Sequence, residues 1–366
     1  MKIECIKEKL IEAVNKANRL TGKNLSMPVL SCVNLCADKN FLTIRSTNLD
    51  CGIEIKIPAK IEAPGEVAIH GVVLTALLSG LPKEKNIVLE SKDGNILVKT
   101  SSNNTLIKTY SSDDFPSIPK LNTHKTVEMS PKSLIKGLKS VVYSASLSMV
   151  KPELASVYIW KDSEDLIFVS TDSFRLAEKK IKIKESIDFP SVIIPAKNVV
   201  DIIHTLENIS DDVKILFDRN QIAFETKDIY LMSRVIDATF PDYKQIVPKV
   251  FVTEVIVLKQ DIVDSFKTSQ IFSDKFNQIN VKALPSKKLF VISTKNSDVG
   301  EYTNSLDSSI TGQDVDINFN HRYIADCFQS IDSDSISISI SGANKPLVMR
   351  GVSDKSFSYL VMPMNR

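Results

Sequence analysis

The sequence predicts an α+β protein made of three tandem copies of one unit of about 125 residues. An apolar strand that runs into Ser-Thr recurs three times at a nearly constant step, and helical segments flank each copy. Each unit then continues with alternating, β-rich sequence around a turn. With 366 residues, the chain also exceeds the size at which a single hydrophobic core usually stops growing, so several domains are expected.

The recurring strand is the clearest sign of the triplication. It reads FLTIRSTNLD, LIFVSTDSFR and LFVISTKNSD, and the corresponding threonines Thr47, Thr171 and Thr294 lie 124 and 123 residues apart. One such match could arise by chance, but the helical and closing segments keep nearly the same step. Because each unit is large enough to bury its own core, we expect an array of domains rather than a solenoid.

Two amphipathic helices are expected in each unit. Apolar residues recur three and four positions apart both before and after the repeated strand, which is the spacing of one face of an α-helix. The expected helices cover residues 7–17, 131–141 and 259–269 before the strands, and 71–82, 196–207 and 321–332 after them.

A hairpin and then a proline-bearing segment follow the second helix. Turn signals stand inside the β-rich stretches at 93–94, 218–220 and 342–344. Phe115 and Phe240, each followed by proline, lie 125 residues apart in stretches that suit extended connections between domains. The predicted domains are residues 1–121, 122–250 and 251–366.

The composition is that of an ordinary soluble protein. Apolar residues make up 43% and charged residues 25%, and no stretch approaches the 18 apolar residues that a membrane span needs. The first residues mix charges with apolar side chains, unlike a secretory signal, so we expect a cytoplasmic protein. The five scattered cysteines favour reduced thiols. Cys32 and Cys36 are expected to be small core residues rather than metal ligands.

The search for catalytic motifs finds no site. The histidines His70, His124, His204 and His321 stand at no metal-ligand spacing, and we expect each of them at the surface or at a helix cap. No nucleophile, metalloprotease or dinucleotide motif occurs, so the sequence predicts no catalytic residue, no metal and no cofactor. The alternative to a non-catalytic protein is an enzyme that processes DNA with metal ligands brought together from distant positions in the sequence.

Positive charge is concentrated on the predicted helices, although the net charge is only +2. Together they carry +5 over residues 7–19, 70–80, 131–139, 195–206, 259–267 and 320–328, and the rest of the chain carries −3. Lys132, Lys136 and Lys139 share one helix face, and the helix at 7–19, which begins with Lys7, has a weaker basic face. A solvated helix explains any single lysine equally well. The asymmetry nevertheless favours a surface that faces phosphates.

Four segments carry a resemblance to a known family. They are TDSFRLA at 171–177, VIIPAK at 192–197, FPDY at 240–243 and YLVMPM at 359–364. Together with the triplication, they make the chain similar over its whole length to the β sliding clamps of bacterial DNA polymerase III. The resemblance implies a non-catalytic processivity factor, in which helices pack on antiparallel sheets and two chains close head to tail into a six-domain ring.

The resemblance also implies where the ring closes and where it meets duplex DNA. A ring holds DNA by its topology, so each phosphate contact can be weak and independent of sequence. Implied DNA contacts fall at Lys23, Asn24 and Lys197, in addition to the lysines of the helix at 131–141. The homodimer contact would join the first domain of one chain to the third domain of the next. Its residues would be Leu106, Ile107, Ile271 and Phe272.

Partners of this family insert a short linear motif into a hydrophobic pocket between the second and third domains. The implied partners are the α subunit of the replicative polymerase, the clamp loader and other proteins with this motif, and no membrane is implied. The alternative is a clamp-like scaffold that recruits peptides without serving the replicative polymerase. By position, the pocket residues would be Thr171, Arg175, Leu176, Pro241, Ile246, Asn320, Tyr323, Pro346, Val361, Met362, Pro363 and Met364.

Overall fold

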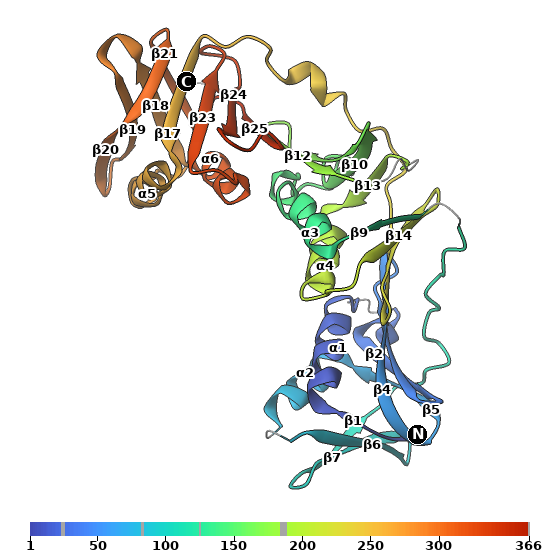
Figure 1. The fold of residues 1–366 in the computed structure, drawn as a ribbon. Helices are drawn as coiled ribbons and strands as arrows, with labels where there is room; N and C mark the ends of the chain where they lie inside the picture. The colour runs from blue at the N-terminus through green and yellow to red at the C-terminus, as the bar shows by residue number, and fades with distance from the viewer. Residues whose placement is uncertain (23–25, 82–83, 124–125, 184–188, 365–366) are drawn as a thin grey trace. The chain divides into compact units, whose positions relative to one another are not determined.

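The chain folds into two compact units, shown in Figure 1. Unit 1 comprises Met1–Lys132 with Lys197–Asp237, and unit 2 comprises Ser133–Ala196 with Ala238–Arg366. The middle repeat is thus divided between the two units. The computed structural model describes all residues except 23–25, 82–83, 124–125, 184–188 and 365–366.

Unit 1 is built on one antiparallel sheet that has twelve strands within the described residues. Its main path runs β8-β7-β6-β1-β4-β16-β15-β14-β9, and β2, β3 and β5 join it beside β4. The pairing of β4 with β16 makes the sheet continuous from the first repeat into the middle one. The strands are β1 (Lys2–Ile6), β2 (Cys32–Asp38), β3 (Phe41–Thr47), β4 (Cys51–Ala63), β5 (Gly65–His70), β6 (Asn86–Lys92), β7 (Asn95–Lys99), β8 (Asn104–Lys108), β9 (Thr126–Met129), β14 (Val213–Phe217), β15 (Gln221–Glu225) and β16 (Ile229–Arg234).

Unit 2 holds two antiparallel sheets. The larger sheet runs β13-β10-β11-β12-β25-β24-β23-β17-β21, and the smaller one runs β20-β19-β18-β22. The pairing of β12 with β25 joins the middle repeat to the third. The strands are β10 (Ser156–Asp162), β11 (Asp165–Thr171), β12 (Arg175–Lys182), β13 (Val192–Pro195), β17 (Thr253–Leu258), β18 (Gln278–Leu284), β19 (Leu289–Asn296), β20 (Gly300–Leu306), β21 (Ser308–Gly312), β22 (Val315–Asn320), β23 (Ser335–Ile340), β24 (Leu347–Gly351) and β25 (Phe357–Val361).

A helix forms in each of the six segments where the sequence predicts one. The helix expected at 321–332 ends early as an α-helix and continues as a short 3-10 turn, Phe328–Ser330. No helix among the described residues is long and apolar enough to cross a membrane. The helices are α1 (Lys7–Arg19), α2 (Gly71–Gly80), α3 (Pro131–Lys139), α4 (Ala196–Leu206), α5 (Lys259–Ser269) and α6 (His321–Cys327).

Local sequence rules account for the hairpins and for the helix packing. In the β6–β7 hairpin, Asp93 and Gly94 have φ of 50° and 70°, as the predicted two-residue turn requires. In unit 1, α1 and α2 pack side by side against the sheet (Figure 1). In unit 2, Gly137 lets α3 approach β11, because a Cβ there would lie 2.5 Å from the ring of Phe168. The predicted α+β fold of helices and antiparallel sheets is confirmed.

Two side chains lie deeper than the sequence predicts. Lys7 is buried, and its ammonium group donates a hydrogen bond to the carbonyl of Leu81 at 2.7 Å, so it adds nothing to a basic surface. His321 is also buried rather than at the surface, and its Nε2 lies 2.9 Å from the carbonyl oxygen of Phe266. In both cases the residue that receives the side chain is more than 50 positions away, so local spacing did not reveal it.

The buried ring of His321 should make stability depend on pH. Burial lowers the pKa of His321 below 6.5, so the unfolded chain binds this proton more readily. The stabilisation from neutral His321 is therefore present above about pH 6.5 and is lost as the pH falls toward the folded-state pKa. Urea titrations of His321→Gln at pH 7.5 and pH 5.5 should give a smaller difference in unfolding free energy than the unmodified chain gives. Equal differences in the variant and the unmodified chain would contradict the assignment.

Candidate functional site

The predicted pocket residues all belong to unit 2, and the turn between β11 and β12 is its best-defined part. The Thr171 hydroxyl donates to the carbonyl of Arg175 at 2.6 Å and accepts the N–H of Ser173 at 3.1 Å. Ser173 adopts the left-handed conformation, with φ of 78°. These constraints fix the turn and leave the adjacent Phe174 side chain 60% exposed at the surface.

Arg175 is held by the third repeat rather than by solvent. Its Nε lies 3.0 Å from the Asp172 carboxylate, one terminal nitrogen lies 2.5 Å from that of Asp326 on α6, and its guanidinium stacks 4.5 Å from the ring centroid of Tyr323. The side chain is only 11% exposed. Arg175 therefore forms a rigid, charge-neutralised wall beside the turn, because a bidentate or multiply bonded guanidinium is fixed in one orientation.

The end of the chain crosses from the large sheet toward the small one. In the β12–β25 ladder, Leu176 lies opposite Leu360 and Arg175 lies opposite Val361. The N–H of Met362 donates to the carbonyl of Phe174 at 2.8 Å, and the N–H of Met364 donates to the carbonyl of Asn318 at 2.8 Å. Val361 is fully buried, whereas the residues 362–364 that follow it are half-buried and contribute to the surface.

The start of α6 supplies two more predicted pocket residues. The side-chain oxygen of Asn320 caps the helix by accepting the N–H groups of Arg322 at 3.0 Å and Tyr323 at 3.3 Å. The Tyr359 hydroxyl donates to the carbonyl of Tyr323 at 2.7 Å. These bonds hold the Tyr323 ring over Arg175.

The other predicted pocket residues are less closely tied to this group. Ile246 is 49% exposed on the connecting segment before β17, and Pro346 precedes Leu347, which pairs with Val361. Pro241 accepts the N–H of Tyr243 at 2.7 Å. Within the connecting segment, Val247 rather than Ile246 lines a cavity together with Leu176.

Sequence reasoning missed several residues that shape this region. Asp172 follows Thr171 in the turn, and its carboxylate accepts the N–H groups of Phe174 at 2.9 Å and Arg175 at 3.0 Å. That pattern is visible in the sequence as an aspartate-led turn. The ion pair of Asp326 with Arg175 spans 151 residues, so no local signal could have identified it.

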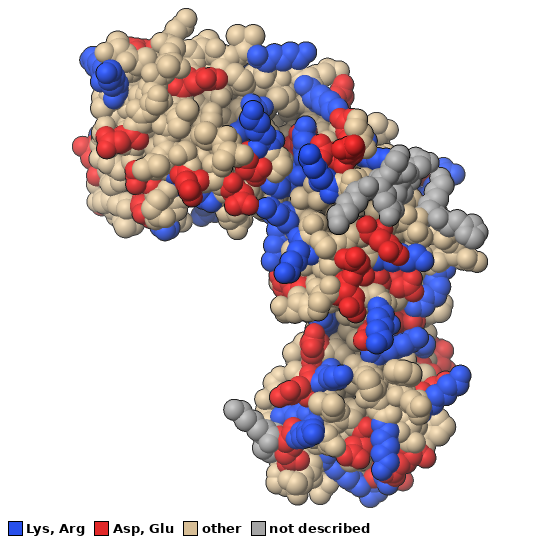
Figure 2. Space-filling view, in the orientation of Figure 1, with Lys and Arg blue, Asp and Glu red and all other residues tan. Residues whose placement is uncertain are grey.

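The predicted DNA-facing lysines are exposed but not uniformly free of counter-charges. Lys132, Lys136 and Lys139 lie on the exposed side of α3, and Lys197 is exposed in the first turn of α4. The Lys136 ammonium lies 2.8 Å from the Asp332 carboxylate and lowers the pKa of that group. Lys23 and Asn24 lie outside the described residues. Figure 2 shows positive and negative side chains mixed over the visible face of each unit.

Two of the predicted dimer residues lie on strand β8, which ends its sheet, and the other two lie in a 3-10 turn, Gln270–Phe272, that contacts the terminal strand β20. Leu106 on β8 is 57% exposed, whereas its neighbour Ile107 is buried in unit 1. In unit 2, Ile271 is 68% exposed, and Phe272 stacks on Tyr302 of β20 with 6.2 Å between ring centroids. Each unit thus offers a sheet edge with an exposed apolar side chain.

A search of the described residues finds no group of three or more His, Cys, Asp or Glu that could hold a metal ion. Three surfaces stand out in the described part of the chain: a pocket wall built on the β11–β12 turn, exposed lysines on two helices, and two sheet edges.

Comparison with known proteins gives one consistent family along the whole chain. Family models match residues 1–119 (DNA polymerase III beta subunit, N-terminal domain), 128–242 (central domain) and 244–365 (C-terminal domain). The beta sliding clamp of Synechococcus elongatus is 25% identical over 373 residues, and that of Bacillus subtilis is 23% identical over 382 residues. Both alignments cover 100% of this chain and 99% of the relative.

Solved structures show the same fold. The DNA polymerase sliding clamp from Bacillus subtilis superimposes with a TM-score of 0.94 at 22% identity, and the DNA polymerase III beta subunit from Thermotoga maritima with a TM-score of 0.93 at 22% identity. Each superposition covers 100% of this chain and 99% of the other.

Proposed function

Because the chain belongs to the DNA polymerase III beta subunit family, the bacterial sliding clamps, we propose that two copies close into a ring around duplex DNA. The protein is a processivity clamp of DNA polymerase III, and this role is non-catalytic. The match of all three repeats does not favour the alternative of a scaffold that no longer serves the polymerase. We place its action in the cytoplasm.

The main support for ring closure is that β8 in unit 1 and β20 in unit 2 are both edge strands. An exposed edge strand pairs readily with another chain, and natural proteins cover such edges. Joining β8 of one copy to β20 of the next would bury Leu106 and Ile271, and the same contact repeated by a two-fold axis closes the ring and pairs both of these edges. The predicted domains 1–121, 122–250 and 251–366 would then contribute six domains to the ring.

The contact with DNA would be electrostatic and independent of sequence. Lys132 on α3 and Lys197 on α4 supply exposed positive charge, and Lys136 and Lys139 add to the same helix face of α3, although Lys136 is paired with Asp332. Weak contacts suit a ring, because topology retains the DNA while low affinity at each phosphate permits sliding.

The partners would dock at the pocket of unit 2. A short apolar motif from the polymerase α subunit, the clamp loader or another DNA-processing protein would pack on Leu176 and on Met362 and Met364, beside the fixed Arg175. The half-buried methionines are suited to this use, because their flexible side chains adapt to different apolar anchors.

The ring can be tested by its topology. Sedimentation at micromolar and nanomolar concentration should show a particle of about twice 40.7 kDa that persists on dilution. Protein loaded on nicked circular DNA by a clamp loader should be lost once the circle is linearised, because free ends let the ring slide off. A monomer at every concentration, or retention on linear DNA with free ends, would refute the ring.

A further inference from the structure

A cavity of about 530 Å³ lies on the large sheet of unit 2, next to the predicted pocket. Leu176, Val348 and Leu360 form its buried floor, and Ile256 and Val352 flank it with side chains that are 43% and 45% exposed. Among the residues that line it, only Leu176 belongs to the predicted pocket. The cavity therefore extends the apolar surface beyond that pocket, over strands β25, β24, β23 and β17.

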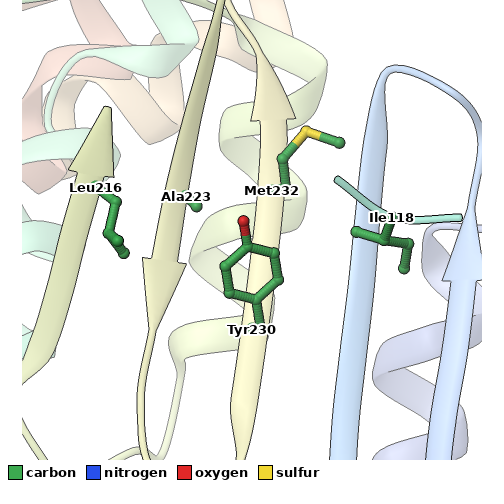
Figure 3. Close-up of a cluster of buried hydrophobic side chains, with 5 residues drawn as sticks. All are labelled: Ile118, Leu216, Ala223, Tyr230 and Met232. Atoms are coloured by element: carbon green, nitrogen blue, oxygen red, sulfur yellow. The ribbon is translucent and has the colours of Figure 1, made fainter. Parts of the chain in front are cut away.

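Unit 1 carries the same sheet face, and in each unit a proline-bearing connecting segment lies on it. The segment is residues 115–121 in unit 1 and residues 240–247 in unit 2, where the Tyr243 hydroxyl donates to Glu178 and Val247 lines the cavity. The 124-residue step from Thr47 to Thr171 also relates Gly52 on β4 to Leu176 on β12. Gly52 lies opposite Met232 in its ladder, as Leu176 lies opposite Leu360 in unit 2. In unit 1, however, the covered face holds a hydrophobic cluster, shown in Figure 3, that includes a residue of the connecting segment.

The covering segment is extended and spans residues 115–121. Ile118 is buried, and a Cβ on Gly52 would lie only 3.0 Å from its side chain. The Tyr230 hydroxyl donates to the carbonyl of Pro119 at 3.0 Å and accepts the N–H of Leu121 at 3.0 Å. Unit 1 thus shows how an extended segment with an apolar side chain lies across this face.

Charge also joins the covering segment to the sheet in unit 1. Lys120 of the segment lies 2.5 Å from the carboxylate of Glu54 and 3.6 Å above the ring centroid of Tyr230. Tyr230 is paired with Glu225 on β15, so this end of the face carries two carboxylates and receives a lysine. An acidic face is matched by a basic occupant.

The corresponding face in unit 2 has the opposite charge. Glu178, which corresponds to Glu54, already accepts a hydrogen bond from the Tyr243 hydroxyl at 2.6 Å and lies 3.8 Å from Lys180. Ser358 stands opposite Glu178 where Tyr230 stands opposite Glu54, and Arg350 donates to the Ser358 hydroxyl at 3.2 Å.

Two cations of this face have no carboxylate partner among the described residues. Within the described part of the chain, neither Arg350 nor Lys355 is in an ion pair, and both line the cavity with Lys180. Three cations therefore stand against the single carboxylate of Glu178. An acidic side chain is the complementary occupant, because it can accept charge-assisted hydrogen bonds from a guanidinium and an ammonium group.

We infer that the cavity binds a second part of the partner peptide: an extended, acidic segment that continues from the motif in the predicted pocket and lies beside residues 240–247. The inference rests on the proposed function, since one peptide fills both sites through their common residue Leu176. The segment places an apolar side chain on the cavity floor and a carboxylate beside Arg350 and Lys355. Affinity for partners then depends on residues outside the apolar motif.

The probes are three synthetic peptides with one polymerase-derived apolar motif, measured by fluorescence polarisation with the full chain. One peptide ends at the motif, one has a five-residue tail with two glutamates, and one has the same tail with two glutamines. The glutamate tail should tighten binding about fivefold over the glutamine tail, the size expected of one or two partly exposed ion pairs. Raising the salt concentration should remove this gain.

Arg350→Glu tests the site directly. It should abolish the gain from the glutamate tail and leave the affinity for the tail-less peptide unchanged. Lys287→Glu makes the same change of charge at an exposed position that does not line the cavity, and it should keep the gain. The inference would be overturned if the two tailed peptides bound with equal affinity, or if Arg350→Glu and Lys287→Glu reduced the gain from the glutamate tail equally. Either result would leave the proposed pocket intact. If the tail-less peptide does not bind the unmodified chain, the pocket assignment falls together with the inference.

Discussion

Replacing Met362 and Met364 by alanine should weaken the binding of a polymerase-derived peptide by about 100-fold or more. Both side chains are half-buried, and a ligand that covers them gains roughly 1.5–3 kcal/mol for each methionine. Loss of about 3 kcal/mol corresponds to a factor of about 100 in Kd. Isothermal titration calorimetry at matched protein concentrations would measure the change.

The double alanine variant should remain folded, which makes the result interpretable. Its backbone keeps the bonds from the Met362 and Met364 N–H groups to the carbonyls of Phe174 and Asn318, because alanine preserves both donors. Met27→Ala, which removes another half-buried methionine but in unit 1, is the matched control and should bind the peptide normally. An unchanged Kd in the double variant would refute the pocket assignment.

The second large effect concerns a buried ion pair between the middle and third repeats. Lys179 on β12 is 1% exposed, and its ammonium lies 3.0 Å from Asp354 and 2.6 Å from the hydroxyl of Ser356. Asp354→Asn would leave this ammonium buried without a counter-charge. Such a loss costs about 3–5 kcal/mol, so the free energy of unfolding of unit 2 should fall by that order. Urea denaturation followed by circular dichroism would measure it.

Two further variants separate charge from packing. Asp332→Asn removes the carboxylate of an ion pair with Lys136 that is 2.8 Å long but exposed, and it should cost less than about 1 kcal/mol. Combining Asp354→Asn with Lys179→Met should recover much of the loss, because no unpaired charge then remains buried. A loss from Asp354→Asn as small as that from Asp332→Asn would show that the buried pair does not stabilise the junction.

The ion pair of Asp354 with Lys179 should also make the stability of unit 2 depend on pH. Burial and charge have opposite effects on the pKa of Asp354. Burial raises the pKa of Asp354, but hydrogen bonds from Ser356 and the Lys179 ammonium outweigh it and lower the pKa below 3.8. The stabilisation is therefore present above the unfolded-state pKa and is lost as the pH falls through the folded-state value.

Features governed by neighbouring residues could be predicted from the sequence. The six helices follow from apolar spacing, and the turns after the first two repeated strands follow from their threonine hydroxyl and their asparagine or aspartate side chain. Thr47 and Thr171 make the same bonds, to the carbonyls of Cys51 at 2.7 Å and Arg175 at 2.6 Å. The triplication can be recognised in the sequence because these helix and turn patterns recur in successive repeats.

Features governed by distant residues could not be predicted in this way. The sequence placed Arg175 near a pocket only through a resemblance, and it gave no sign of Asp326, which fixes the guanidinium. Likewise, Lys7 and His321 carry polar side chains that are buried because a carbonyl lies within reach in the folded chain. Spacing along the chain says nothing about such partners.

The sequence by itself determined three α+β repeats, their helices and turns, and the basic face of α3. Only the tertiary structure decided which repeat junction is open. At the first junction, Gly52 admits Ile118 of the connecting segment. At the second, Leu176 occupies the position of Gly52, the connecting segment contacts the sheet through Tyr243, and a cavity remains beside Leu176. The physical reason is that periodicity records which side chains face inward, whereas close packing between strands from different repeats decides what space is left over.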